Sequence, residues 1–164
     1  MAQNSHLIYN PAANKGRAGK ILPQVKQLLQ KYGFVYDLTL TDGPGHALAL
    51  SRKLAEDGCP LVVAAGGDGT VNEVINGLMQ AHQKGYRIPA LGVLPIGRGN
   101  DFAFGANIPH ELDEACGALQ HNTRCPIDIG RVTGGDYPSG RYFGNGIGLG
   151  FGRGWVRSRQ DDSR

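Results

Sequence analysis

The chain has 164 residues and a formal charge of +3, and its 40% hydrophobic and 19% charged residues are typical of one globular domain. These values exclude a disordered chain, and because lysine and arginine form no run longer than a dipeptide, nucleic-acid binding has no electrostatic basis. No apolar stretch approaches the roughly 20 residues of a membrane-spanning helix, and the first residues lack the features of a signal peptide.

The predicted secondary structure alternates between strands and helices. Short apolar runs predict strands at residues 7–9, 34–40, 61–65, 90–94 and 127–129. Apolar residues at helical spacing predict helices at residues 21–32, 48–55, 71–82 and 112–119. This order predicts an α/β fold, a Rossmann-like three-layer domain with a mostly parallel sheet and right-handed crossovers. Such sheets bind ligands at the carboxyl ends of their strands.

The cysteines bear on the redox environment. Cys59, Cys116 and Cys125 lack the paired spacing of a zinc site, and their odd number argues against a disulfide framework. We therefore expect reduced thiols and a cytoplasmic chain that meets a membrane only from its aqueous side.

Glycine is the residue type whose frequency stands out. The 26 glycines are more than twice the usual share of about 7%, and they gather between apolar runs. The most informative cluster is Gly66-Gly67-Asp68-Gly69-Thr70, between a buried strand and a helix. Two glycines allow backbone conformations closed to other residues and leave room for a phosphate. We predict a phosphate-binding turn here.

The start of the following helix supports the same prediction. Thr70 and Glu73 fit the capping-box pattern S/T-x-x-E, so the helix would begin here with the positive end of its dipole toward the phosphate. Asp68 would repel a phosphate unless a cation lay between them, so we assign it to Mg²⁺ coordination, with orientation of an acceptor hydroxyl as the second assignment. The structural alternative is a tight turn in which Asp68 binds its own backbone. For Glu73 alone, capping is the favoured interpretation.

Generic nucleotide motifs are absent, since no Walker A loop and no complete G-x-G-x-x-G occurs. Three segments in order instead resemble the diacylglycerol kinase catalytic-domain family, which includes bacterial lipid kinases and the sphingosine and ceramide kinases. They are Asn10-Pro11, the run from Gly66 to Glu73, and Pro95-Ile96-Gly97-Arg98-Gly99-Asn100-Asp101-Phe102-Ala103. The resemblance spans roughly residues 5 to 133. It implies transfer of the γ-phosphoryl group of ATP to a lipid hydroxyl, diacylglycerol-like or sphingoid, with Mg²⁺ neutralising charge.

The resemblance also implies a set of site residues. ATP would lie against Asn10, Thr41, Gly66, Gly67, Asp68, Gly69, Thr70, Val71 and Asn72, with Asp68 as the catalytic residue nearest the metal. The turn at residues 95–101 would close the other wall. Arg98 stands where the family usually has threonine, and its planar guanidinium could contact phosphates or crowd the pocket.

Structural alternatives remain for several of these positions. Asn10 and Asn14 also suit simple turn chemistry, and Thr41-Asp42-Gly43-Pro44 suits a turn before a helix. His46 is interpreted as a helix-start residue rather than a catalytic imidazole.

The last third of the chain departs from the family pattern. Members of the family fold a second, mainly β domain that contributes the lipid cleft and a general base, and no position here matches that base. We expect a nucleotide-binding domain over residues 1–133, then the start of a truncated second β domain and a polar tail over residues 134–164. The segment 148–151 resembles the family's Gly-Phe-Asp-Ala segment, but Gly152 and Arg153 replace its acidic and small residues.

Two rival functions remain open. A NAD kinase or phosphofructokinase relative would share the Gly-Gly-Asp-Gly turn, although residues 95–103 argue against it. A nucleotide-binding remnant without catalysis is motivated by the missing second domain and by Arg98. The expected partner is a lipid alcohol at a membrane surface.

Overall fold

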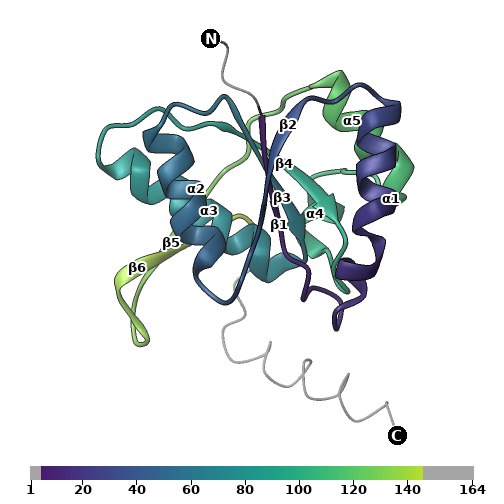
Figure 1. Ribbon diagram of the computed structural model, residues 1–164. Coiled ribbons are helices and arrows are strands. Elements are labelled where there is room, and N and C mark those ends of the chain that lie inside the picture. Colours follow the sequence, from purple (N-terminus) through teal and green to yellow (C-terminus); the bar gives the residue numbers. More distant parts are fainter. Residues whose placement is uncertain (1–4, 146–164) are drawn as a thin grey trace, which may run out of the picture.

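A four-stranded parallel sheet forms the middle layer of the molecule (Figure 1). The computed structural model describes residues 5–145. The strands lie in the order β2-β1-β3-β4, and all three neighbouring pairs are parallel. They are β1 (Ser5–Tyr9), β2 (Tyr36–Leu40), β3 (Leu61–Gly66) and β4 (Ala90–Pro95). The predicted α/β fold is confirmed.

Helices cover both faces of this sheet, as Figure 1 shows. On one face lie α1 (Arg17–Lys31) and α5 (Leu112–His121), and on the other lie α2 (His46–Glu56) and α3 (Asp68–Gln83). A short helix that was not predicted, α4 (Asp101–Gly105), follows β4. Within residues 5–145, no helix combines the length and the hydrophobicity needed to cross a membrane.

Strand β3 explains why the sheet occupies the centre. All six of its residues are buried, because alternate side chains enter two separate cores. Leu61, Val63 and Ala65 pack with α1 and α5, while Val62 and Ala64 pack with α2 and α3. The continuous apolar run in the sequence therefore corresponds to a strand buried on both faces.

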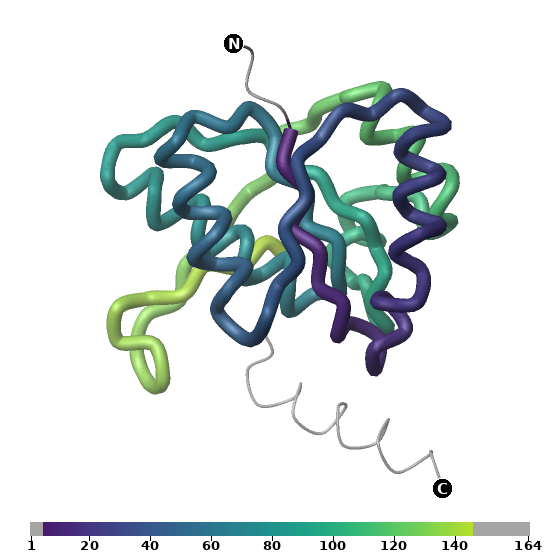
Figure 2. The backbone as a smooth tube through the Cα atoms, in the orientation of Figure 1, coloured from purple at the N-terminus to yellow at the C-terminus, as the bar shows by residue number. Residues whose placement is uncertain are grey.

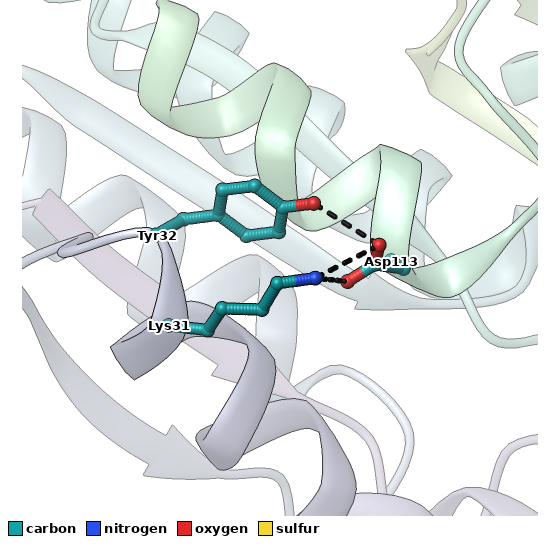
Figure 3. Close-up of polar contacts among 3 residues, drawn as sticks. All are labelled: Lys31, Tyr32 and Asp113. Carbon is teal, nitrogen blue, oxygen red and sulfur yellow. Dashed lines mark hydrogen bonds and ion pairs between the residues drawn. The ribbon is translucent and has the colours of Figure 1, made fainter.

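A polar contact joins the two helices on one face (Figure 3). Lys31 Nζ, at the end of α1, donates to both carboxylate oxygens of Asp113 at the start of α5, at 2.8 and 3.1 Å. The Tyr32 hydroxyl donates to the same carboxylate at 3.1 Å. These donors hold the pKa of Asp113 below its ordinary value, and the carboxylate raises the pKa of Lys31.

The final described strands form a separate hairpin, β5 (Gly130–Gly134) and β6 (Tyr137–Phe143), paired antiparallel. The strand predicted at residues 127–129 is therefore wrong. Ile127 is 43% exposed, and Pro126 before it lacks the backbone donor that a sheet position needs. A turn at residues 135–136 joins the two strands. The domain boundary predicted after residue 133 stays a prediction and falls within β5.

Part of the predicted C-terminal region, residues 146–164, lies outside the residues that the structure describes. The segment 148–151 and the polar tail therefore lie outside the described residues. The cysteines Cys59, Cys116 and Cys125 do lie among the described residues, and none of them forms a disulfide there.

We predict that Gly77→Ala destabilises the fold, because Gly77 lies where α3 crosses α2. A Cβ atom there would overlap Ser51 Oγ and the backbone oxygen of Leu48. Overpacking of this kind costs about 1–3 kcal/mol in the free energy of unfolding, measurable by urea denaturation. The matched control is Gly69→Ala in the same helix, where a Cβ meets open space and alanine costs nothing or stabilises by up to about 1 kcal/mol. Equal unfolding midpoints for the two variants would contradict the close crossing.

Candidate functional site

A cavity of about 550 Å³ opens at the carboxyl ends of the four parallel strands. Each of the four strand-to-helix connections contributes to its lining, at residues 10–14, at residues 41–44, at Gly67, Gly69 and Thr70, and at residues 97–98. In Figure 2 the loops after β1 and β2 lie at this same lower edge. The loops lead into α1, α2 and α3, so the N-terminal ends of three helices face one region. That arrangement favours an anionic ligand.

Predicted site residues far apart in the sequence meet on one wall of the cavity. Asn10 Nδ2, just after β1, donates to the Thr70 hydroxyl at 2.9 Å, and Asn10 Oδ1 accepts from the Ala12 N–H at 3.0 Å. The Thr41 N–H donates to the Tyr9 carbonyl at 2.8 Å. Asn10, Thr41 and Thr70 all line the cavity. The Asn10 side chain therefore forms the local turn that was the structural alternative and also contacts Thr70 of the glycine turn.

The loop before α1 holds an uncommon backbone conformation. The buried Tyr9 hydroxyl donates to the Ala18 carbonyl at 2.6 Å, which holds the start of α1 over the end of β1. Burial raises the pKa of Tyr9 to about 12, so it remains a neutral donor. Asn14 and Lys15 have φ of 52° and 55°, and Gly16 has φ of 81°. Left-handed conformations in non-glycine residues are often found at functional sites.

The glycine turn differs from its predicted geometry at the helix start. Helix α3 begins at Asp68 with Gly67 at its N-cap and no side-chain cap, so the predicted capping box is wrong. Thr70 is the third residue of the helix and binds Asn10 instead. Glu73 Oε1 accepts from the Gly45 N–H at 2.9 Å, which caps the neighbouring helix α2. Because α3 starts two residues before Thr70, the capping geometry does not arise.

The glycines of the turn are needed for space rather than for unusual dihedral angles. Neither Gly66 nor Gly67 has a positive φ, so the predicted conformational role is wrong. A Cβ on Gly66 would overlap the Thr70 side chain. A Cβ on Gly67 would lie 3.2 Å from the Gly97 Cα, tighter than nearly all real contacts. The two turns after β3 and β4 therefore touch through glycine backbone.

Asp68 reaches across this contact to the next helix. Its Oδ1 accepts from the Phe102 N–H in α4 at 2.9 Å, so it does not bind its own turn as the structural alternative proposed. Its Oδ2 lies near Gly99, where a Cβ would be 3.1 Å from that oxygen and 3.7 Å from Asp101 Oδ1. Among residues 5–145 no group of three or more His, Cys, Asp or Glu could hold a metal ion. Mg²⁺ commonly takes only one or two carboxylates and fills its other positions with water and phosphate, so these residues fit that ion.

The turn after β4 forms the part of the lining next to the glycine turn. Asn100, at φ 57°, accepts at Oδ1 from the Gly97 N–H at 3.0 Å and donates from Nδ2 to the Pro95 carbonyl at 3.2 Å. The Asn100 side chain thus stabilises the turn through hydrogen bonds to the backbone of that same turn. Gly97 and Arg98 line the cavity. Arg98 is exposed, and no described residue forms a hydrogen bond with its guanidinium.

Four of the predicted site residues lie outside the lining, and Asp68, which binds α4, is one of them. Gly66 is the last residue of β3, and the Val71 side chain of α3 is buried in the core, 3% exposed. Asn72 Oδ1 accepts from Arg141 Nε and Nη2 at 3.0 and 2.6 Å, and its Nδ2 donates to the Tyr142 carbonyl at 3.0 Å. Their role toward ATP stays a prediction. In this structure Asn72 connects α3 to β6.

Asn76 was not anticipated from the sequence. It is 7% exposed, and its side chain pairs with both backbone groups of Tyr142, donating to the carbonyl and accepting from the N–H, each at 2.9 Å. The Asn76 side-chain amide thus forms the same pair of hydrogen bonds with Tyr142 that a residue of an adjacent strand would form. A single asparagine in a helix gives no sign of a partner 66 residues away, so this function was not visible in the sequence.

The fold and the site define an open α/β protein with its ligand cavity at the carboxyl edge of the sheet. The family model for the diacylglycerol kinase catalytic domain matches residues 4–132, and the chain belongs to this family. It is 37% identical over 133 residues to a diacylglycerol kinase of Bacillus subtilis (strain 168), covering 80% of this chain and 43% of that protein. It is 32% identical over 145 residues to that of Staphylococcus carnosus (strain TM300), covering 88% and 44%.

Solved structures agree with the sequence comparison. A crystal structure of a diacylglycerol kinase from Bacillus anthracis str. Sterne superposes with a TM-score of 0.67 at 28% identity, covering 77% of this chain and 45% of that one. The resemblance stated from the sequence motifs is confirmed. The chain spans less than half the length of these relatives.

We predict that Asn76→Ala loosens β6 at Tyr142, while the Asn72 contacts still join the strand to α3. The substitution leaves the Tyr142 N–H without its buried acceptor, and such a loss costs about 1–3 kcal/mol. Amide hydrogen exchange should show reduced protection at Tyr142, with the four-stranded sheet unchanged. The control is Gln80→Ala on the same helix, which should leave Tyr142 protected. Equal protection of Tyr142 in both variants would count against the pairing.

Proposed function

We propose that this chain is the nucleotide-binding part of an ATP-dependent lipid kinase, which transfers the γ-phosphoryl group of ATP to the hydroxyl of a diacylglycerol-like or sphingoid lipid. The observation that carries the proposal is the cavity at the start of α3, lined by Gly67, Gly69 and Thr70, in a chain of the diacylglycerol kinase catalytic-domain family. The relatives named above are all called diacylglycerol kinases, which favours this function over NAD kinase or phosphofructokinase activity.

The phosphates of ATP are proposed to lie against the first turn of α3. Backbone N–H groups at a helix start are unpaired donors, and the helix dipole favours negative charge there. Gly67 and Gly69 carry no side chain that would separate these donors from a phosphate. Arg98 would add a guanidinium from the neighbouring turn, where no described residue competes for it. Asn10 and Thr41 would complete the nucleotide site from the loops after β1 and β2.

Asp68 is the residue proposed to hold Mg²⁺. Its Oδ1 is held by the Phe102 N–H, which orients the carboxylate and leaves Oδ2 available to a cation. When bound, Mg²⁺ would neutralise the charge that develops on the phosphates during transfer. The same cation removes the repulsion between Asp68 and the nucleotide.

The acceptor is proposed to be a lipid alcohol presented at a membrane surface to a cytoplasmic enzyme. This part of the proposal rests on the family, since the described residues include no matching position for the general base and no assigned lipid cleft. The described residues are proposed to bind ATP and Mg²⁺ and are assigned no contact with the lipid.

We predict that Asp68→Asn weakens binding of ATP in the presence of Mg²⁺ at least about tenfold, a free-energy loss of about 1.4 kcal/mol. Asparagine retains an oxygen acceptor for the Phe102 N–H and removes only the charge, so the fold should persist. Titration calorimetry with ATP, with and without Mg²⁺, measures the effect. Asp113→Asn is the matched control, because it removes a carboxylate from the α1–α5 contact and should leave ATP affinity unchanged.

A turnover assay complements the binding measurement. Labelled ATP would be offered with lipid alcohols, with NAD and with fructose 6-phosphate. A labelled lipid supports the kinase, whereas ATP binding without product identifies a nucleotide-binding module without catalysis. Absence of ATP binding by the unmodified chain would sink the proposal, and unchanged affinity in Asp68→Asn would remove Asp68 from the site.

A further inference from the structure

The loop between β2 and α2 forms one wall of the cavity through residues 41–44. It is held by a small number of local contacts. The Thr41 N–H binds the Tyr9 carbonyl at 2.8 Å, and the Asp42 N–H donates to His46 Nδ1 at 3.1 Å. The same ring nitrogen lies close to the Asp42 carboxylate, and His46 is the first residue of α2, as predicted. The loop ends at Gly45, which has φ of 82°.

The start of α2 lacks the capping that its own sequence would normally supply. Helices usually begin with Ser, Thr, Asp or Asn, whose side chain accepts a backbone N–H, and with acidic residues in the first turn. Here the N-cap is Gly45, and no acidic residue lies in the first turn. The helix therefore needs an acceptor from elsewhere.

Glu73 supplies that acceptor from the neighbouring helix. It lies in the second turn of α3, lines the cavity, and accepts at Oε1 from the Gly45 N–H at 2.9 Å. A hydrogen bond from an amide to a carboxylate is about twice as strong as one between neutral groups. This bond joins the wall at residues 41–44 to the helix whose first turn is the proposed phosphate site.

We propose that Glu73 is a positioning residue that holds the β2–α2 loop against α3 and thereby sets the cavity for the nucleotide. The proposal rests on the proposed function, because the nucleotide is taken to be the ligand of this cavity. Glu73 is not assigned a contact with the reacting phosphate. Its effect passes through Gly45 to the loop.

The helices themselves do not depend on this bond. Ser51 Oγ donates to the Val74 carbonyl at 3.1 Å in the middle of the α2–α3 crossing, and Gly77 allows the two backbones to approach closely there. At the opposite end, Lys84 Nζ donates to Glu56 Oε1 at 2.9 Å. Loss of the Glu73 bond should therefore release the loop and leave the helix pair in place.

Three variants test the proposal on the full chain. Glu73→Ala removes the acceptor, whereas Glu73→Gln retains an oxygen acceptor and removes only the charge. Glu56→Ala is the matched control, because it breaks a contact of equal length between the same two helices at the end away from the cavity. Each variant is examined by amide NMR without ligand and by titration calorimetry with ATP and Mg²⁺.

The expected results separate positioning from general stability. In Glu73→Ala the Gly45 amide resonance should move and exchange faster, signals from the middle of α2 should stay, and the ATP dissociation constant should rise about tenfold, as for loss of a charge-assisted hydrogen bond. Glu73→Gln retains a neutral hydrogen bond of about half the strength, so it should weaken ATP binding only about threefold. Glu56→Ala should leave both the Gly45 amide and ATP affinity unchanged.

Other outcomes would overturn the proposal. An unaltered Gly45 amide in Glu73→Ala would show that Glu73 does not hold the loop. Equal weakening of ATP binding by Glu73→Gln and Glu73→Ala would assign the effect to charge rather than to position. If the unmodified chain binds no ATP, the proposed function fails by itself, and the NMR measurement still decides whether Glu73 holds the loop.

Discussion

The close approach of two backbone turns is the constraint on which the site depends. The turn after β3 touches the turn after β4 at Gly67 and Gly97, where a Cβ atom on Gly97 would overlap the Gly67 backbone and one on Gly67 would be tightly packed. Adjacent parallel strands place such turns side by side at one edge of a sheet, and glycine allows them to make contact. Because they touch, Asp68 can reach the first turn of α4, and Arg98 lines the same cavity as the start of α3.

The polar residues that follow this contact each hold a different segment of the chain. Asp68 binds α4, Thr70 binds the loop after β1, Asn72 binds β6, and Glu73 binds the start of α2. The first two turns of α3 therefore organise their surroundings as well as offering backbone donors to a ligand. A motif with this many structural partners restricts substitution even at positions that touch no ligand. It also explains why Asn72 can belong to the motif while lying outside the cavity lining.

The sequence predicted the elements whose signals are local. The continuous apolar run of β3 and the helical spacing in α1, α3 and α5 gave the layers and the parallel sheet, and the carboxyl-edge rule placed Asn10, Thr41 and the glycine turn together. Helix α4 is five residues long, too short to show periodicity.

The features that the sequence missed depend on contacts between distant residues. The strand predicted at residues 127–129 had a suitable pattern, but β5 begins at Gly130 because its pairing partner is β6. The capping box satisfied a local rule, yet Gly67 sets the helix start and Glu73 finds its partner 28 residues away. Local patterns could not show either result, since both follow from where other segments lie.

The crossing of α2 and α3 at Gly77 has a consequence for motion. At that point the α3 backbone lies against Ser51 and the α2 backbone, and Ser51 is bonded across the crossing, so sliding of one helix past the other would break close contacts. A change in the size of the cavity would therefore involve the short loops at its rim and α1 on the other face of the sheet. Any closure over a bound molecule would be a movement of loops toward a fixed platform.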